Sequence, residues 1–160
     1  AGREPSLEDL TSNQTEIEMR MPALLPDDFI PDVNTRLSLY KRIASAGDDG
    51  ELAELKVEMI DRFGSLPDAA RNLLDIAALR LVARELGVRR IEASEKGGFF
   101  EFAPQNHVDP GWLIGLLQKD PKQWKLDGPT RLKFTRDLAE RKSRMDWVQK
   151  FVGDLANHRV

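Results

Sequence analysis

Two turn sequences constrain the fold of this 160-residue chain more than any other feature. The first, residues 95–98 (EKGG), lies between the apolar runs 88–94 and 99–103. The second, residues 128–130 (GPT), lies between two pairs of apolar side chains: Trp124 and Leu126 before it, Leu132 and Phe134 after it. Glycine-containing turns between apolar runs are typical of β-hairpins. The second half of the chain should therefore contain two antiparallel strand pairs.

The first regular element should be a strand. From Thr15 onward, apolar and charged residues alternate, and Pro22 ends the pattern. The apolar members are Ile17, Met19 and Met21. A period of two predicts a strand with one buried face.

Three helices should follow. The first carries its apolar residues at helical spacing and is followed by Gly47, while the second begins after Asp48 or Asp49 and stops at Gly64. The third has Pro67 near its start and Gly87 past its end. The apolar face of the first helix is Val33, Leu37, Tyr40 and Ala44, and that of the second is Leu52, Leu55, Met59 and Phe63.

Two further helices complete the predicted order of secondary-structure elements. Pro110 should open a short apolar helix, and a long helix should run roughly from Thr135 to Asn157. Strands therefore do not alternate strictly with helices. This predicts the α+β class, with an antiparallel sheet built from the first strand and the two hairpins and covered by helices.

Composition narrows the classes of function. The chain has no cysteine, which excludes disulfides, cysteine-ligated metal centres and thiol nucleophiles, and it has no apolar run approaching the roughly 20 residues that span a bilayer. We therefore expect a cytoplasmic protein without a membrane partner. Neither His107 nor His158 has a partner histidine at helical spacing, and no phosphate-binding loop is present. We expect no catalytic residue, no metal site and no cofactor.

Charge divides the chain into two halves. Residues 1–80 hold 9 basic and 16 acidic residues, whereas residues 81–160 hold 15 basic and 11 acidic residues. The acidic half contains a ridge on the second predicted helix: Glu51, Glu54, Glu58 and Asp61. At 100° per residue these four carboxylates occupy an arc of about 80°. The pattern by itself fits an ordinary solvated helix face, and it also fits a contact with a basic partner.

The basic half offers a second possibility. Six basic residues surround the second hairpin within residues 119–136: Lys119, Lys122, Lys125, Arg131, Lys133 and Arg136. Basic groups on a strand surface can contact phosphates, so a nucleic-acid-binding module is the alternative function.

Several long strings of this sequence resemble one family. Residues 25–43, 61–80, 95–102, 112–121 and 126–134 closely resemble the C-terminal domain of bacterial transcription-repair coupling factor. The resemblance runs in order from about Thr15 to Leu155. The family is a large DNA translocase that uses ATP to displace stalled RNA polymerase and recruits the repair protein UvrA. This chain resembles only its terminal module, in which no ATPase motif occurs.

The resemblance implies a regulatory role. It implies that residues 1–14 are a linker from the preceding motor domain and that residues 15–160 are a C-terminal regulatory domain. Such a domain docks on the UvrA-binding N-terminal domain of the same full-length protein, masks the surface that UvrA uses, and restrains the motor. UvrA, RNA polymerase and DNA would be partners only indirectly. The resemblance favours Glu58 and Asp61 as interface residues, with Glu54 and Glu51 beside them.

Overall fold

Both predicted hairpins are present in the computed structural model, which describes residues 15–160. The first joins β2 (Val88–Ser94) to β3 (Gly97–Phe102), and the second joins β4 (Trp124–Asp127) to β5 (Arg131–Thr135). With β1 (Glu16–Glu18) they form one five-stranded sheet in the order β1-β2-β3-β5-β4. The α+β class is confirmed. The linker predicted for residues 1–14 lies outside the described residues.

One strand pair departs from the predicted antiparallel sheet. β1 pairs with β2 in parallel, with Ile17 opposite Ile91, so the sheet is mixed. β1 is also shorter than the alternating pattern, because Arg20 has a positive φ of 52° that ends the extended backbone. The apolar period predicted the strand correctly but contained no information about the direction of its neighbour.

The first hairpin is tighter than predicted. β3 begins at Gly97, so only Glu95 and Lys96 form the turn and both glycines belong to the strand. A Cβ atom on Gly98 would lie 1.8 Å from the carbonyl oxygen of Glu92. The glycines are therefore required by the close approach of neighbouring backbones as well as by the turn.

Five helices accompany the sheet in the described residues: α2 (Val33–Ser45), α3 (Asp49–Phe63), α4 (Asp68–Leu86), α5 (Pro110–Lys119) and α6 (Arg141–Asn157). Asp48 caps α3, since its side chain accepts a hydrogen bond from the Glu51 amide. Asp32 caps α2 by accepting from the amide and the hydroxyl of Thr35, and these bonds lower the pKa of its carboxyl. No helix among residues 15–160 is long and apolar enough to cross a membrane.

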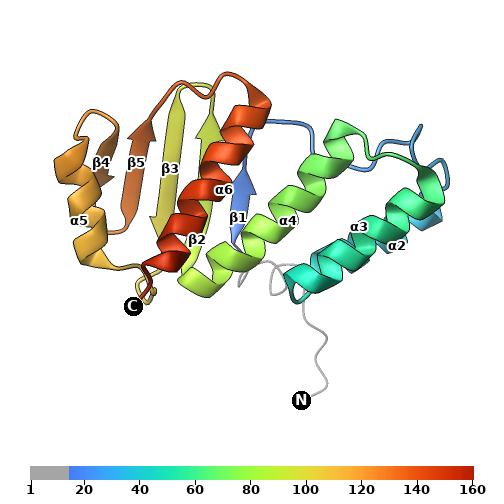
Figure 1. Cartoon of the computed structure of the whole chain (residues 1–160), viewed down its shortest axis with the longest axis horizontal. Coiled ribbons are helices and arrows are strands. Elements are labelled where there is room, and N and C mark those ends of the chain that lie inside the picture. The colour runs from blue at the N-terminus through green and yellow to red at the C-terminus, as the bar shows by residue number, and fades with distance from the viewer. Residues whose placement is uncertain (1–14) are drawn as a thin grey trace, which may run out of the picture. The chain divides into compact units, whose positions relative to one another are not determined.

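The described residues belong to two compact units, which we call the helical unit and the sheet unit. The helical unit is Met21–Leu81, and the sheet unit combines the segment ending at Arg20 with Val82–Val160. Leu39, Ile43, Leu55 and Met59 are among the buried side chains of the core of the helical unit. In the sheet unit, α6 lies against one face of the sheet, where Phe151 packs 4.8 Å from Phe100, ring centroid to centroid (Figure 1).

The predicted apolar face of α2 is wrong except at Tyr40, which is half-buried against the core. Val33 and Leu37 are 55% and 53% exposed, whereas Leu39 and Ile43 are buried. The helix carries two apolar arcs about 100° apart, and only one of them can face the core. On α3, by contrast, the predicted stripe is confirmed, because Leu52, Leu55 and Met59 are buried and Phe63 is half-buried.

The last helix starts later than predicted. α6 begins at Arg141, because the segment before it pairs with the first hairpin turn: Arg136 donates to the Lys96 carbonyl and Leu138 to the Glu95 carbonyl. Leu138 is buried as predicted, but from a loop. Leu126 lies opposite Leu132 on β5, as predicted, although its own side chain is 47% exposed on the edge strand β4.

Candidate interaction surface

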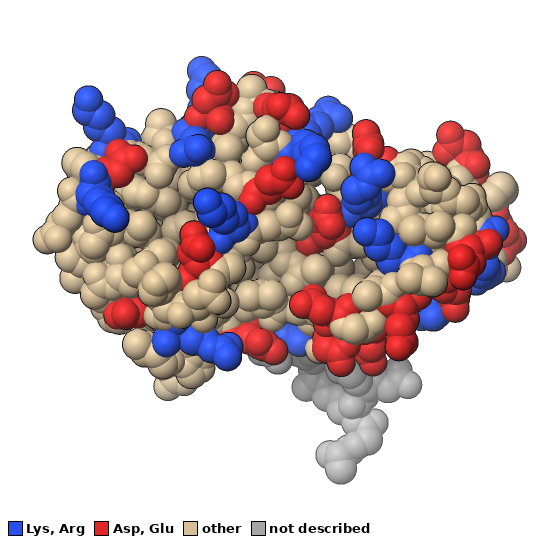
Figure 2. Space-filling model, viewed as in Figure 1, with Lys and Arg blue, Asp and Glu red and all other residues tan. Residues whose placement is uncertain are grey.

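The four predicted interface carboxylates all project from α3, but the structure gives them different surroundings. Figure 2 shows acidic side chains gathered over the part of α3 near its first turns. The buried stripe of α3 fixes which side of the helix faces solvent. The carboxylates therefore stand on the exposed side, as the sequence predicted, and what distinguishes them is their partners.

Glu51 is occupied in capping the helix. Its carboxylate accepts a hydrogen bond from the Gly47 amide, while its own amide donates to Asp48. This reciprocal arrangement resembles a capping box, in which two free amides at a helix start are satisfied together. Glu51 thus has a structural role at the start of α3, which the sequence interpretation did not foresee.

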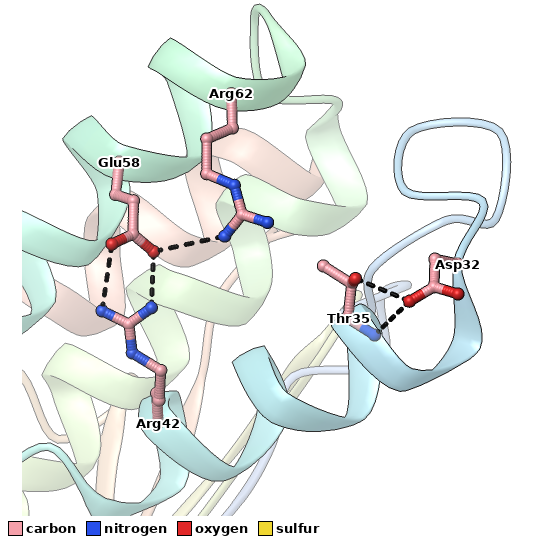
Figure 3. A network of polar contacts seen from close by, with 5 residues as sticks. All are labelled: Asp32, Thr35, Arg42, Glu58 and Arg62. Atoms are coloured by element: carbon pink, nitrogen blue, oxygen red, sulfur yellow. Dashed lines mark hydrogen bonds and ion pairs between the residues drawn. The ribbon is translucent and has the colours of Figure 1, made fainter.

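Glu58 is occupied in an ion-pair network. The Arg42 guanidinium of α2 contacts both Glu58 oxygens, with Nη1 2.5 Å from Oε2 and Nη2 3.4 Å from Oε1, and Arg62 Nη1 lies 3.7 Å from Oε2 (Figure 3). The hydrogen bond from Arg42 holds the pKa of the Glu58 carboxyl below its ordinary value, and Glu58 in turn raises the pKa of Arg42. Two cations therefore balance the negative charge of Glu58 within the helical unit.

Glu54 and Asp61 are the exposed carboxylates that remain available. Neither has an ion pair or hydrogen bond to another described side chain. Val57 and Ile60 lie on the same outward side of α3 and are 59% and 41% exposed. The outward face of α3 is therefore a mixed surface of two available carboxylates and two apolar side chains.

A hollow of about 390 Å³ lies beside this face, between the end of α2 and the start of α3. Three of the four predicted residues line it, and Asp61 does not. Its lining is Arg42, Ser45, Ala46, Glu51, Glu54, Leu55 and Glu58. An open hollow with three carboxylates and one arginine suits the end of a long cationic side chain.

Sequence reasoning missed four residues of this surface. Arg62 follows Glu58 by four positions, a spacing that predicts a helical ion pair and was available from the sequence. Arg42 comes from a different helix, so its contact depends on the packing of α2 against α3. Val57 and Ile60 could have been found as apolar residues outside the predicted stripe.

The basic region of residues 119–136 lies in the sheet unit. Lys125 and Lys133 stand opposite each other on β4 and β5 and are exposed. Arg131 is instead held by Glu101, with Nε 2.7 Å from Oε2, and lies over the ring of Phe99. That contact lowers the pKa of the Glu101 carboxyl. Trp124 and Phe134 are buried, as predicted, and offer no stacking surface for bases.

Comparison with known proteins identifies the family. A family model described as the TRCF domain matches residues 19–113. The chain belongs to the TRCF domain family. The resemblance stated from the sequence is therefore confirmed.

The sequences of two relatives align with this chain over nearly its whole length. This TRCF domain is 68% identical to a transcription-repair-coupling factor of Escherichia coli (strain K12) over 160 residues, which is 100% of the chain and 14% of the relative. It is 54% identical to that of Haemophilus influenzae over 97% of the chain and 14% of the relative. The chain thus spans about one seventh of the length of these two relatives.

A solved structure supports the fold. The TRCF domain superposes on a crystal structure of the C-terminal domain of transcription-repair coupling factor with a TM-score of 0.77. The alignment covers 91% of this chain and 94% of the other at 22% identity. At this identity the match supports the mixed helix-and-sheet architecture and carries no further conclusion.

Proposed function

We propose that this TRCF domain is an autoinhibitory interaction domain of a transcription-repair coupling factor. In this proposal it docks through the outward face of α3 on the UvrA-binding N-terminal domain of the same full-length protein. Docking masks the surface that UvrA uses and restrains the motor. UvrA binding and engagement with stalled RNA polymerase on DNA are then properties of the full-length protein that this domain regulates, in the cytoplasm.

The exposed face of α3 is the observation that carries the proposal. Glu54 and Asp61 have no counter-charge among the described side chains, and Val57 and Ile60 expose apolar surface beside them on α3. Apolar side chains at the centre with charged groups around them are typical of a protein interface that must form and separate. A basic partner surface would relieve the repulsion between neighbouring carboxylates.

Covalent linkage between the two domains favours their autoinhibitory contact. Within one polypeptide the two domains meet at high effective concentration, so even weak docking dominates at rest. Coupling energies between sites are typically about 1–3 kcal/mol, which a partner can overcome.

The proposal is tested with full-length protein that carries Glu54→Ala and Asp61→Ala. Loss of both available carboxylates should weaken docking by roughly tenfold to a hundredfold. The open form then becomes more populated, so UvrA capture and the resting ATPase rate should both rise. A matched control removes two exposed loop carboxylates of the helical unit, by Asp27→Ala and Asp28→Ala. If the α3 variant leaves both readouts at the resting level with an unchanged circular dichroism spectrum, this face is not the docking surface.

A substitution in the Arg42–Glu58 pair should have the opposite effect on docking. Arg42→Ala should leave Glu58 with only the longer contact to Arg62 at 3.7 Å, which makes Glu58 more available to a partner without removing any acidic group. Docking on a basic surface should then tighten, and UvrA capture should fall below the level of the unmodified protein. A rise in UvrA capture would contradict the proposed role of this face.

The alternative function, nucleic-acid binding through residues 119–136, predicts a different pattern. The opposed, exposed Lys125 and Lys133 are the observation that favours it: Asp127 lies 3.9 Å from Lys133 and balances only one of the two like charges, and a phosphate between them would balance the other. Lys125→Ala with Lys133→Ala would then reduce duplex DNA binding by the domain, and the α3 variants would have no effect.

A further inference from the structure

Three segments far apart in the sequence meet at one end of the sheet unit. They are the end of β1, the turn between β2 and β3, and the start of α6 (Figure 1). Backbone bonds join the last two, since Leu138 donates to the Glu95 carbonyl at 2.7 Å. The arrangement brings Arg20, Lys96 and Arg141 to one place, although no motif in the sequence links them.

These segments enclose a hollow of about 370 Å³ with an excess of positive charge. Its lining contains four cations and one carboxylate. The lining residues are Arg20, Ser94, Glu95, Lys96, Ala139, Arg141 and Arg144. A surface hollow with three net positive charges concentrates anions from solution.

The cations at the rim are available for a ligand. Within residues 15–160, the side chains of Arg20, Lys96 and Arg141 form no ion pair, and all three residues are exposed. In the rest of the sheet unit, several arginines and lysines are paired with carboxylates: Arg90 with Glu16 and Glu92, and Arg131 with Glu101, for example. The rim of this hollow is therefore unlike the neighbouring surface.

The fourth cation lies at the base of the hollow. Arg144 is 2% exposed and donates to four backbone carbonyls, at 2.8 Å to Met19, 2.9 Å to Arg20, 3.0 Å to Leu138 and 3.4 Å to Ala139. These bonds use four of its five N–H donors, and no described carboxylate neutralises its charge. A buried cation in a medium of lower dielectric acts at longer range than an exposed one.

The start of α6 adds to the positive potential. The side chain of its N-cap residue, Glu140, makes no capping hydrogen bond and instead accepts from the Ser143 hydroxyl at 3.2 Å. The first amides of the helix are thus not used by the N-cap side chain. Helix starts favour anions because their free amides and the helix dipole are both positive there.

We propose that this hollow is a binding site for a phosphate group. Guanidinium and ammonium groups that converge from three segments match the several oxygens and the double charge of a phosphate. The phosphate is either a free anion or part of a nucleic-acid backbone. The site lies in the sheet unit and does not depend on the docking proposed for α3.

The test is a pair of NMR titrations of the 160-residue chain at low ionic strength. One uses inorganic phosphate and the other a single-stranded oligonucleotide of about 12 nucleotides. We expect saturable shifts of the amides of residues 94–96 and 139–142. The double variant Lys96→Ala with Arg141→Ala should weaken binding by about tenfold, because it removes two charge-assisted contacts. A matched control, Lys150→Ala with Arg159→Ala, removes the same charges elsewhere on the sheet unit and should leave the affinity within about twofold.

The two arms distinguish the sources of the phosphate. If the oligonucleotide shifts the same amides at lower concentration than phosphate does, and the double variant weakens it, the ligand is a nucleic-acid backbone. If phosphate alone saturates these amides, the ligand is a free phosphate. Absence of saturation in both titrations, or equal weakening by the control variant, would overturn the proposal.

Discussion

At the scale of single residues, Glu58 is set apart from the other carboxylates of α3 by the hydrogen bond from Arg42. That bond lowers the pKa of the Glu58 carboxyl in the folded protein relative to roughly 4.3 in an unfolded chain. A lowered carboxyl pKa contributes stability above the unfolded value, and this contribution is lost as pH falls through the folded pKa. The effect is confined to the acidic range, because above it Glu58 is ionised in both states.

We therefore predict that Arg42→Ala raises the pKa of Glu58. The raised pKa reduces the part of the stability difference between neutral and acidic pH that Glu58 contributes, and Arg62 retains the remainder. Carboxyl carbon NMR titration measures the pKa directly, and thermal melts over the same pH range measure the stability. Lys41→Ala is the control, since Lys41 is an exposed cation of α2 that makes no ion pair with Glu58. An unchanged Glu58 pKa in Arg42→Ala would show that the pair does not persist in solution.

Two glycines should respond in opposite ways to alanine. Gly98→Ala places a Cβ against the Glu92 carbonyl of the neighbouring strand and should destabilise the chain by about 1–3 kcal/mol or more. Gly115→Ala lies in α5, where the added methyl meets no other atom, and should stabilise it by about 0.5–1 kcal/mol. Urea unfolding measures both. Equal stability of the two variants would contradict the close backbone approach at Gly98.

At the scale of elements, Arg144 connects the first strand to the last helix. It lies on α6 and bonds the carbonyls of Met19 and Arg20, which follow β1, and that of Leu138 in the loop before α6. β1 is only three residues long and pairs with a single neighbour, β2. The arginine therefore supplies a contact that the short strand pair alone does not.

Arg144→Met should cost at least about 3 kcal/mol, because several buried carbonyls lose their donor at once. It should also increase hydrogen exchange of the β1 amides relative to those of β3, which pair on both sides. Arg141→Met changes an exposed arginine of the same helix and should alter stability by less than about 0.5 kcal/mol. Urea unfolding and native-state hydrogen exchange provide the two measurements. Unchanged exchange at β1 would show that Arg144 does not secure this strand.

At the scale of the whole molecule, charge is unevenly distributed, and the acidic surface is distinct from the basic one. The acidic residues concentrate in the first half of the sequence, which contains α3, and the basic residues in the second half, which contributes every lining residue of the phosphate hollow except Arg20. The two proposals therefore use different surfaces and opposite charges. Docking through α3 and phosphate binding in the hollow should both depend on ionic strength, because exposed charged groups take part in each.

Salt should weaken docking of the domain on the UvrA-binding N-terminal domain. Raising sodium chloride from about 50 to about 500 mM screens exposed charges, so the dissociation constant should rise by roughly tenfold or more. Isothermal titration calorimetry at several salt concentrations measures the dependence. With Glu54→Ala and Asp61→Ala the slope should become shallower, because fewer charges take part. A dissociation constant independent of salt would show that docking does not use the carboxylates of α3.

Local patterns in the sequence determined the elements, and tertiary packing decided their relations. Alternation predicted β1, the glycine turns predicted both hairpins, and the stripe from Leu52 to Phe63 predicted the buried face of α3, because each of these depends on neighbours within a few residues. The choice between the two apolar arcs of α2, the parallel pairing of β1 and the late start of α6 all depend on contacts with distant segments.

The proposed binding surfaces also divide into what the sequence shows and what only packing decides. The carboxylates of α3 were visible as a pattern, but only the approach of Arg42 from another helix decides that Glu58 is neutralised while Glu54 and Asp61 stay available. The phosphate hollow could not be predicted at all, since Arg20, Lys96 and Arg141 meet only when the sheet has formed.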